Sequence, residues 1–198
     1  MPVVVKAALF LTLARIALCP IFLFIYLFYE RLEISLSVMP YMLLFILLLC
    51  ELSDIFDGVM ARRSNQVTEL GKILDPMADS IVRLSILLTF TQGIVKLPLF
   101  LVLVFVARDA MISTLRTLCA LHGKALAARF SGKVKAVIQA IAIFAIVSLM
   151  IPYSQDLISL EVFRTSCFWV VFLTACYTLV SGFEYLWTHR GYIKQAWR

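Results

Sequence analysis

The sequence predicts an all-α fold, that of a polytopic membrane protein with six transmembrane helices. Apolar residues make up 63% of the 198 residues and charged residues only 15%, a balance far from that of a soluble domain. The apolar residues also gather into six long runs. Because a helix needs about 20 mainly apolar residues to cross a bilayer, each run is a candidate transmembrane helix.

Charged residues, prolines and glycines separate the six runs, which cover residues 7–29, 36–61, 72–92, 97–121, 134–152 and 160–187. These runs use nearly the whole chain, so residues 1–198 are expected to form a single integral-membrane domain. Short connections favour antiparallel packing of successive helices. Any chemistry must then lie within the bundle or at its rim.

The runs differ in their polar residues. The first run, 7–29, lies where a signal peptide would lie. It stays apolar well past Arg15 and has no small-residue cleavage site, so we expect a helix that is retained. Aspartates end the second run and begin the third. The fourth and fifth contain arginines and lysines near their shared loop, and the sixth ends in aromatic residues typical of a membrane interface.

The net charge of +6 has an uneven distribution over the predicted loops. One side of the six-helix arrangement has Lys6, Arg62, Arg63, Lys72, Lys124, Arg129, Lys133, Lys135, Arg190, Lys194 and Arg198, and the other has only Arg31, Lys96 and Arg164. The positive-inside rule therefore predicts a multi-pass protein of the cytoplasmic (inner) membrane, with both termini and the aspartates facing the cytoplasm. Dispersed basic residues without a soluble recognition module argue against nucleic-acid binding.

Four aspartates lie close together in sequence, at the junction of the second and third runs. Asp54 and Asp57 are three residues apart, and Asp75 and Asp79 are four apart, so each pair shares one helix face. A short turn would let the two pairs face each other. Clustered carboxylates at a membrane are stable only when protonated or neutralised, and oxygen ligands without His or Cys favour Mg²⁺ or Mn²⁺. Four of them are enough for two divalent ions that assist phosphoryl transfer.

Small and basic residues accompany the aspartates. Gly58, Ala61 and Gly71 leave space against the backbone, and Arg62 offers planar donors to a phosphate. The simpler alternative is that these residues cap helices and form a turn in headgroup water. Arg83 lies one turn after Asp79, where an ion pair and a role in orienting substrate are both open.

The spacing D-x2-D-G-x2-A-R-x8-G-x3-D-x3-D resembles the defining motif of the CDP-alcohol phosphotransferases. That resemblance implies a membrane enzyme, acting as a homodimer, that binds a CDP-linked lipid with two metal ions on its diphosphate. Asp54, Asp57 and Asp75 would be metal ligands, and Asp79 would be both a ligand and the base that takes the proton of the acceptor hydroxyl. By the same resemblance Gly58, Ala61, Arg62 and Gly71 would line the CDP site.

A second set of basic residues suggests the acceptor. Arg108 and Arg116 share a face of the fourth run, and Lys133 and Lys135 open the fifth. Together they would bind a phosphate. The alternative is that Arg108 pairs with Asp109 or with a carboxylate of the third run, and that Arg116 and the lysines lie at the membrane interface. An anionic acceptor favours glycerol 3-phosphate or inositol phosphate over serine, choline or ethanolamine.

Longer patterns narrow the acceptor. ARDAMISTLR, G-K-x-K-x3-Q, SGFEYLW and the opening LTLARIALCP resemble bacterial phosphatidylglycerophosphate synthases. The expected reaction is transfer of a phosphatidyl group from CDP-diacylglycerol to glycerol 3-phosphate with release of CMP. Alternatives are the same chemistry with inositol phosphate, serine or phosphatidylglycerol as acceptor, or a divalent-cation transporter. A transporter should have polar residues along a path to the far side of the membrane. These apolar runs offer almost no such path.

Overall fold

The computed structural model describes residues 3–63, 69–121 and 130–196, and side chains within residues 14–53, 77–119 and 130–191. The described residues form six helices and no strand. The helices are α1 (Val3–Phe28), α2 (Met39–Arg63), α3 (Glu69–Thr89), α4 (Leu99–Leu121), α5 (Phe130–Ser154) and α6 (Leu160–Ala196). Each predicted run therefore corresponds to one helix, and the all-α prediction is confirmed.

The helix ends differ from the predicted boundaries in both directions, since α2 and α4 begin at residues 39 and 99, later than their runs. The helices α3 and α5 begin at residues 69 and 130, ahead of the apolar runs, and α6 continues to residue 196 instead of ending at 187. Apolarity marks only the part of a helix that faces other apolar groups. Backbone hydrogen bonding continues through the adjacent polar residues, which have adequate helix propensity.

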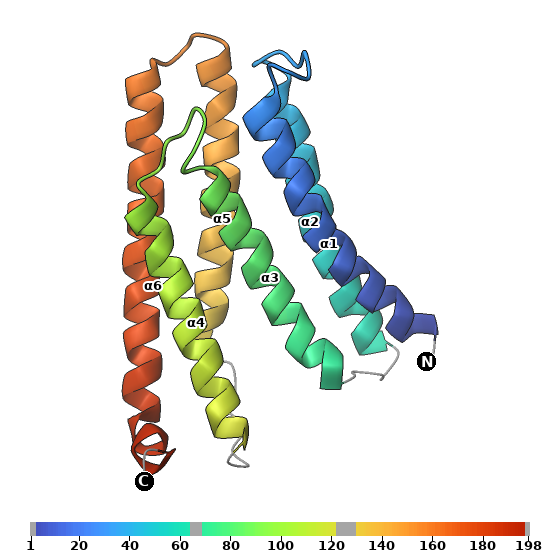
Figure 1. Ribbon diagram of the computed structural model, residues 1–198, viewed down its shortest axis with the longest axis vertical. Coiled ribbons are helices and arrows are strands. Elements are labelled where there is room, and N and C mark those ends of the chain that lie inside the picture. Colours follow the sequence, from blue (N-terminus) through green and yellow to red (C-terminus); the bar gives the residue numbers. More distant parts are fainter. Residues whose placement is uncertain (1–2, 64–68, 122–129, 197–198) are drawn as a thin grey trace.

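Successive helices alternate in direction along an elongated bundle (Figure 1). The helix α1 packs against α2 and α3, α6 packs against α4 and α5, and α2 also contacts α5. Both chain ends lie at the same end of the bundle as the last turns of α2 and α4 and the first turns of α3 and α5 (Figure 1). The fold thus gathers at one end the segments for which function is predicted.

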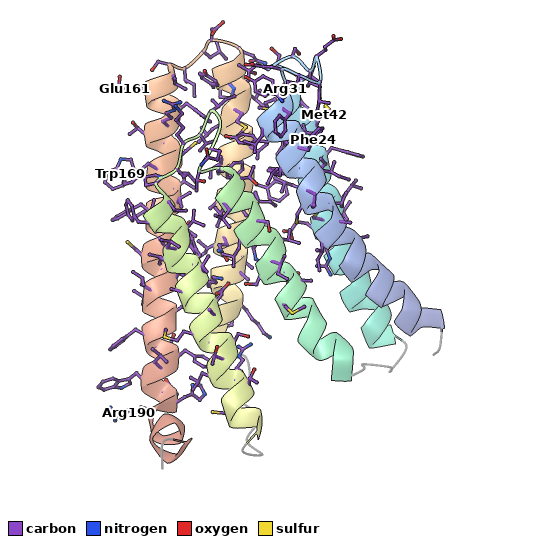
Figure 2. The ribbon with its side chains drawn as sticks, viewed as in Figure 1. Phe24, Arg31, Met42, Glu161, Trp169 and Arg190 are labelled. Atoms are coloured by element: carbon purple, nitrogen blue, oxygen red, sulfur yellow. The ribbon has the colours of Figure 1, made fainter. Side chains whose placement is uncertain are left out.

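Apolar side chains fill the bundle and also cover much of its outside. Phe22, Phe90 and Phe105 are fully buried in the core. Phe24, Met42 and Trp169 point outward from the helices (Figure 2), and each is exposed. A large outward apolar surface is what a bundle surrounded by lipid requires.

Among the described residues, two helical segments are long and apolar enough to cross a membrane, Phe130–Ser154 and Leu160–Gly191. Two shorter apolar segments, Ala14–Phe28 and Met39–Ser53, belong to α1 and α2. These features fit a membrane protein. The six-span arrangement itself stays a prediction.

The end of the bundle opposite the chain termini has its own polar anchor, Tyr26. Its hydroxyl donates a hydrogen bond to the Gln92 carbonyl and accepts one from the Val95 amide, both at 3.0 Å. Between them Gly93 has φ +63°, and a Cβ atom there would lie 2.8 Å from the Tyr26 ring. Only glycine satisfies both constraints, so this loop is firmly joined to α1.

Candidate active site

The eight motif residues lie on two consecutive helices, as their spacing predicts. Asp54, Asp57, Gly58, Ala61 and Arg62 belong to the last turns of α2, and Gly71, Asp75 and Asp79 belong to α3. Of these eight, only Asp79 has a described side chain. The convergence of the four carboxylates, and the CDP site formed by the other residues, therefore stay predictions.

The carboxylate of Asp79 lies between two guanidinium groups. Arg15 Nη1 donates to Asp79 Oδ1 at 2.8 Å, and Arg83 Nη2 lies 3.5 Å from Oδ2. The Arg15 side chain is only 3% exposed, so its charge depends on carboxylates for neutralisation. The Arg83 contact is the ion pair that its spacing from Asp79 allowed.

Sequence reasoning did not assign a role to Arg15. The available signal was its charge within the otherwise apolar run of residues 7–29, since a charge inside a membrane segment usually has a partner or a function. The contact also explains how α1 takes part in the site. It joins α1 to α3 at the residue predicted to be the base.

A cavity of about 640 Å³ opens beside Asp79. Its lining includes the charged side chains of Glu51, Asp79 and Arg83. Residues of α5 complete the lining: Ala136, Val137, Ala140, Ile141, Phe144, Ala145 and Ser148. Glu51 lies one turn before Asp54 on α2 and is a further carboxylate that sequence reasoning did not select. The cavity gives a ligand access to the carboxylate of Asp79.

The donor chemistry of this region suits a hard divalent cation. The motif supplies carboxylate oxygens alone, and at Asp79 both oxygens already face positive charge from arginines. A bound cation would supply the same neutralisation. No group of three or more potential metal ligands occurs among the described side chains, which do not include Asp54, Asp57 or Asp75.

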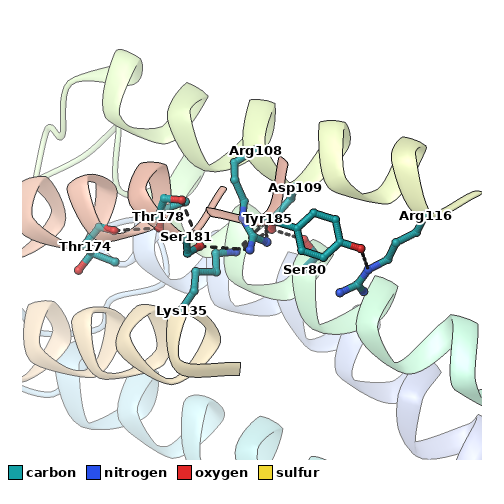
Figure 3. A network of polar contacts seen from close by, with 9 residues as sticks. All are labelled: Ser80, Arg108, Asp109, Arg116, Lys135, Thr174, Thr178, Ser181 and Tyr185. Carbon is teal, nitrogen blue, oxygen red and sulfur yellow. Dashed lines mark hydrogen bonds and ion pairs between the residues drawn. The ribbon is translucent and has the colours of Figure 1, made fainter. Parts of the chain in front are cut away.

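A second polar cluster adjoins the first and is centred on Asp109. Lys135 Nζ donates to both Asp109 oxygens at 2.8 Å, and Arg108 Nη1 donates to Oδ1 at 3.1 Å. The Ser80 hydroxyl donates to Oδ2 at 2.6 Å. This cluster, shown in Figure 3, brings together side chains of α3, α4 and α5.

The structure places Arg108 and Lys135 together, each paired with Asp109. Sequence reasoning named Asp109 only as an alternative partner of Arg108, and it missed Ser80 entirely. Local sequence patterns cannot show such a contact, because Asp109 and Lys135 lie on different helices and meet only when α4 and α5 both pack against α3 and α6. Ser80 directly follows Asp79, so the two clusters meet on one helix.

Two glycines lie beside the Arg108 side chain, and the space at Gly182 is the tighter of the two. A Cβ atom at Gly182 of α6 would lie 3.1 Å from Arg108 Cγ, and one at Gly132 of α5 would lie 3.7 Å from Nη2. Arg108 Nη2 also donates to the Ser181 hydroxyl at 3.2 Å. The Arg108 side chain thus lies in a slot between α5 and α6, which fixes its direction.

Arg116 and Lys133 do not join the Asp109 cluster. Arg116 Nε donates to the Tyr185 hydroxyl at 3.4 Å, and its guanidinium lies 5.6 Å from the centre of that ring (Figure 3). Lys133 is exposed and forms no ion pair with another described side chain. Two of the four residues predicted to bind the acceptor phosphate are thus adjacent, and two are separate.

The sequence profile of CDP-alcohol phosphatidyltransferases matches residues 5–180. A CDP-diacylglycerol–glycerol-3-phosphate 3-phosphatidyltransferase of Bacillus subtilis (strain 168) is 35% identical over 181 residues, covering 88% of this chain and 90% of the relative.

Two other relatives match shorter segments. The Escherichia coli (strain K12) protein with the same description is 34% identical over 139 residues, which are 67% of this chain and 71% of the relative. A cardiolipin synthase (CMP-forming) of Streptomyces coelicolor is 40% identical over 113 residues, 57% of this chain and 51% of the relative. The chain is therefore a transferase that belongs to the CDP-alcohol phosphatidyltransferase family.

Proposed function

We propose that the protein transfers the phosphatidyl group of CDP-diacylglycerol to the 1-hydroxyl of sn-glycerol 3-phosphate, giving phosphatidylglycerophosphate and CMP. The observation that carries this proposal is similarity along nearly the whole chain to a relative described as the enzyme of that reaction. The reaction is a step in phospholipid biosynthesis. The cation pair of Arg108 and Lys135 supports an acceptor that has its own phosphate.

In this proposal Asp54, Asp57, Asp75 and Asp79 hold two divalent ions, Mg²⁺ or Mn²⁺. When bound, the ions neutralise negative charge on the diphosphate and on the departing CMP. Asp79 accepts the proton of the acceptor hydroxyl. The hydroxyl oxygen bonds to the β-phosphorus as the bond from that phosphorus to CMP breaks. Gly58, Ala61, Arg62 and Gly71 line the site of the CDP group.

Arg108, Arg116, Lys133 and Lys135 are the proposed binding residues for the acceptor phosphate. Arg108 and Lys135 are held by Asp109 at 3.1 and 2.8 Å, so an incoming phosphate exchanges with a carboxylate for the same N–H donors. Arg116 and Lys133 approach the phosphate from positions outside the Asp109 cluster. Guanidinium groups suit this task because they bind phosphate through two parallel hydrogen bonds.

The proposal extends to the whole protein. Residues 1–198 form one integral-membrane domain with six spans in the cytoplasmic membrane, and the termini and active site face the cytoplasm. The lipid tails of CDP-diacylglycerol then stay in the bilayer, while the nucleotide and the acceptor come from water. Two copies of the chain form a homodimer.

The runner-up acceptor is phosphatidylglycerol, because one relative is described as a cardiolipin synthase. That acceptor is itself a lipid and has only a phosphodiester charge. The partial coverage of this relative, 57% of the chain against 88% for the first relative, favours glycerol 3-phosphate.

The test is CMP release by the purified protein in detergent with CDP-diacylglycerol. Glycerol 3-phosphate, inositol phosphate, serine and phosphatidylglycerol are compared as acceptors, with and without EDTA and added Mg²⁺, beside the Asp79→Asn variant. We expect release that requires glycerol 3-phosphate and Mg²⁺ and is lost in the variant. Release only with another acceptor would overturn the proposed substrate, and release unaffected by EDTA would overturn the metal site.

A further inference from the structure

Gln139 is buried, and its side chain forms no hydrogen bond with the part of the chain that the structure describes. It is 1% exposed, and neither Oε1 nor Nε2 has a partner there. Its amide has two N–H donors and an oxygen with two acceptor positions, all unused. A buried polar group without a partner is destabilising, so the ligand-free fold gains nothing from an amide at this position.

The place of Gln139 in the fold connects it to the acceptor cluster. It lies one turn after Lys135 on the same buried face of α5, and Lys135 bonds Asp109. Ala140 follows Gln139 in sequence, and Ala136 lies one turn before Ala140. Both alanines line the cavity that Asp79 also lines. Gln139 thus shares a helix face with Lys135, and its neighbours on α5 line the cavity beside the predicted base.

We propose that the side-chain amide of Gln139 binds the non-reacting hydroxyl of the acceptor. This inference rests on the proposed function and defines its specificity. Glycerol 3-phosphate has a phosphate, a reacting hydroxyl at the far carbon and a second hydroxyl between them. That middle hydroxyl needs one acceptor and one donor, and a single amide provides both.

The helix geometry suits such a ligand. Successive turns of α5 are about 5.4 Å apart, which is the scale of a three-carbon phosphate. With the phosphate at Lys135, an acceptor that lies along α5 extends toward the next turn, where Gln139 lies. The acceptor hydroxyl satisfies the amide only in the bound state, so the cost of burial is offset when the correct substrate arrives.

The competing explanation is structural: a trapped water satisfies the amide, or Gln139 merely fills space. The two explanations differ in which substrate they favour. A binding role predicts that the enzyme discriminates against an acceptor without the middle hydroxyl. A structural role predicts no such discrimination by this residue.

The experiment compares glycerol 3-phosphate with 3-hydroxypropyl phosphate, which keeps the phosphate and the reacting hydroxyl and lacks the middle one. The wild-type protein should prefer glycerol 3-phosphate by about tenfold or more in kcat/KM, because a site built for a hydroxyl rejects the analogue without it. In Gln139→Leu, which has similar volume and no polar atom, the preference should fall to about twofold or less. Gln139→Met, unbranched like Gln, serves as a second variant.

Thermal unfolding without substrate supplies an independent readout. Because the amide is unsatisfied in the ligand-free protein, the Tm of Gln139→Leu should equal or exceed that of the wild type. A lower Tm with unchanged acceptor preference would overturn the inference in favour of a structural role. Failure of the wild type to use glycerol 3-phosphate at all would instead overturn the proposed function, so the two failures are distinguishable.

Discussion

Asp109 accepts hydrogen bonds from Ser80, Arg108 and Lys135, and it is the countercharge for two cations with little solvent access. Removing one partner of a buried ion pair leaves an uncompensated charge. Asp109→Asn should therefore lower the free energy of unfolding by about 3 kcal/mol, measured as a fall in Tm in detergent.

The same variant separates a purely structural cluster from a phosphate site. If Arg108 and Lys135 bind phosphate, added glycerol 3-phosphate should raise the Tm of Asp109→Asn more than that of the wild type, because the ligand replaces the lost negative charge. Asp109→Glu keeps the charge and serves as the control. An equal Tm increase in all three proteins would contradict the phosphate role.

Gly182 provides a test of the Arg108 slot that alters no charged residue. In Gly182→Ala the new methyl group would lie 3.1 Å from Arg108 Cγ, so the arginine must shift. We expect KM for glycerol 3-phosphate to rise about three- to tenfold, equivalent to one weakened hydrogen bond, with KM for CDP-diacylglycerol unchanged. Gly191→Ala is the matched control, since nothing lies within 4 Å of its new Cβ atom on the same helix.

At the scale of helices, the contact between Arg15 and Asp79 joins α1 to α3. Arg15→Gln removes the positive charge beside Asp79, the carboxylate that is proposed to accept the proton. It leaves the acceptor cluster of α4 and α5 in place. Steady-state kinetics should show kcat lowered by about tenfold or more with little change in either KM, as expected when a positioning residue is lost. Arg31→Gln, which changes an exposed arginine in the loop after α1, should behave as wild type.

The elements show where sequence reasoning succeeds. Apolar runs located all six helices because burial and helix formation depend on the same stretch of residues. The four-residue spacing of Asp79 and Arg83 placed them one helical turn apart, and the structure has an ion pair between them. The contacts of Arg15 and Ser80 and the burial of the Gln139 amide were not predicted, because each depends on how helices distant in sequence pack together.

At the scale of the whole molecule, six alternating spans require the loops containing Lys96 and Asp156 to lie on the side opposite the termini (Figure 1). A single cysteine replacing Asp156, in a variant without the native cysteines, should react with a membrane-impermeant maleimide in intact cells. A cysteine replacing Lys133 should react only after the membrane is opened. Labelling of both in intact cells would contradict the proposed topology.

Consecutive residues of α3 serve two different clusters: Asp79 faces Arg15 of α1, and Ser80 faces Asp109 of α4. A rotation or tilt of this helix must then displace the predicted base and the acceptor cluster together. Neither cluster can adjust alone to a poorly fitting acceptor. Selectivity for the acceptor and the rate of proton removal are therefore expected to change together. Mutations on α3 should seldom alter one without the other.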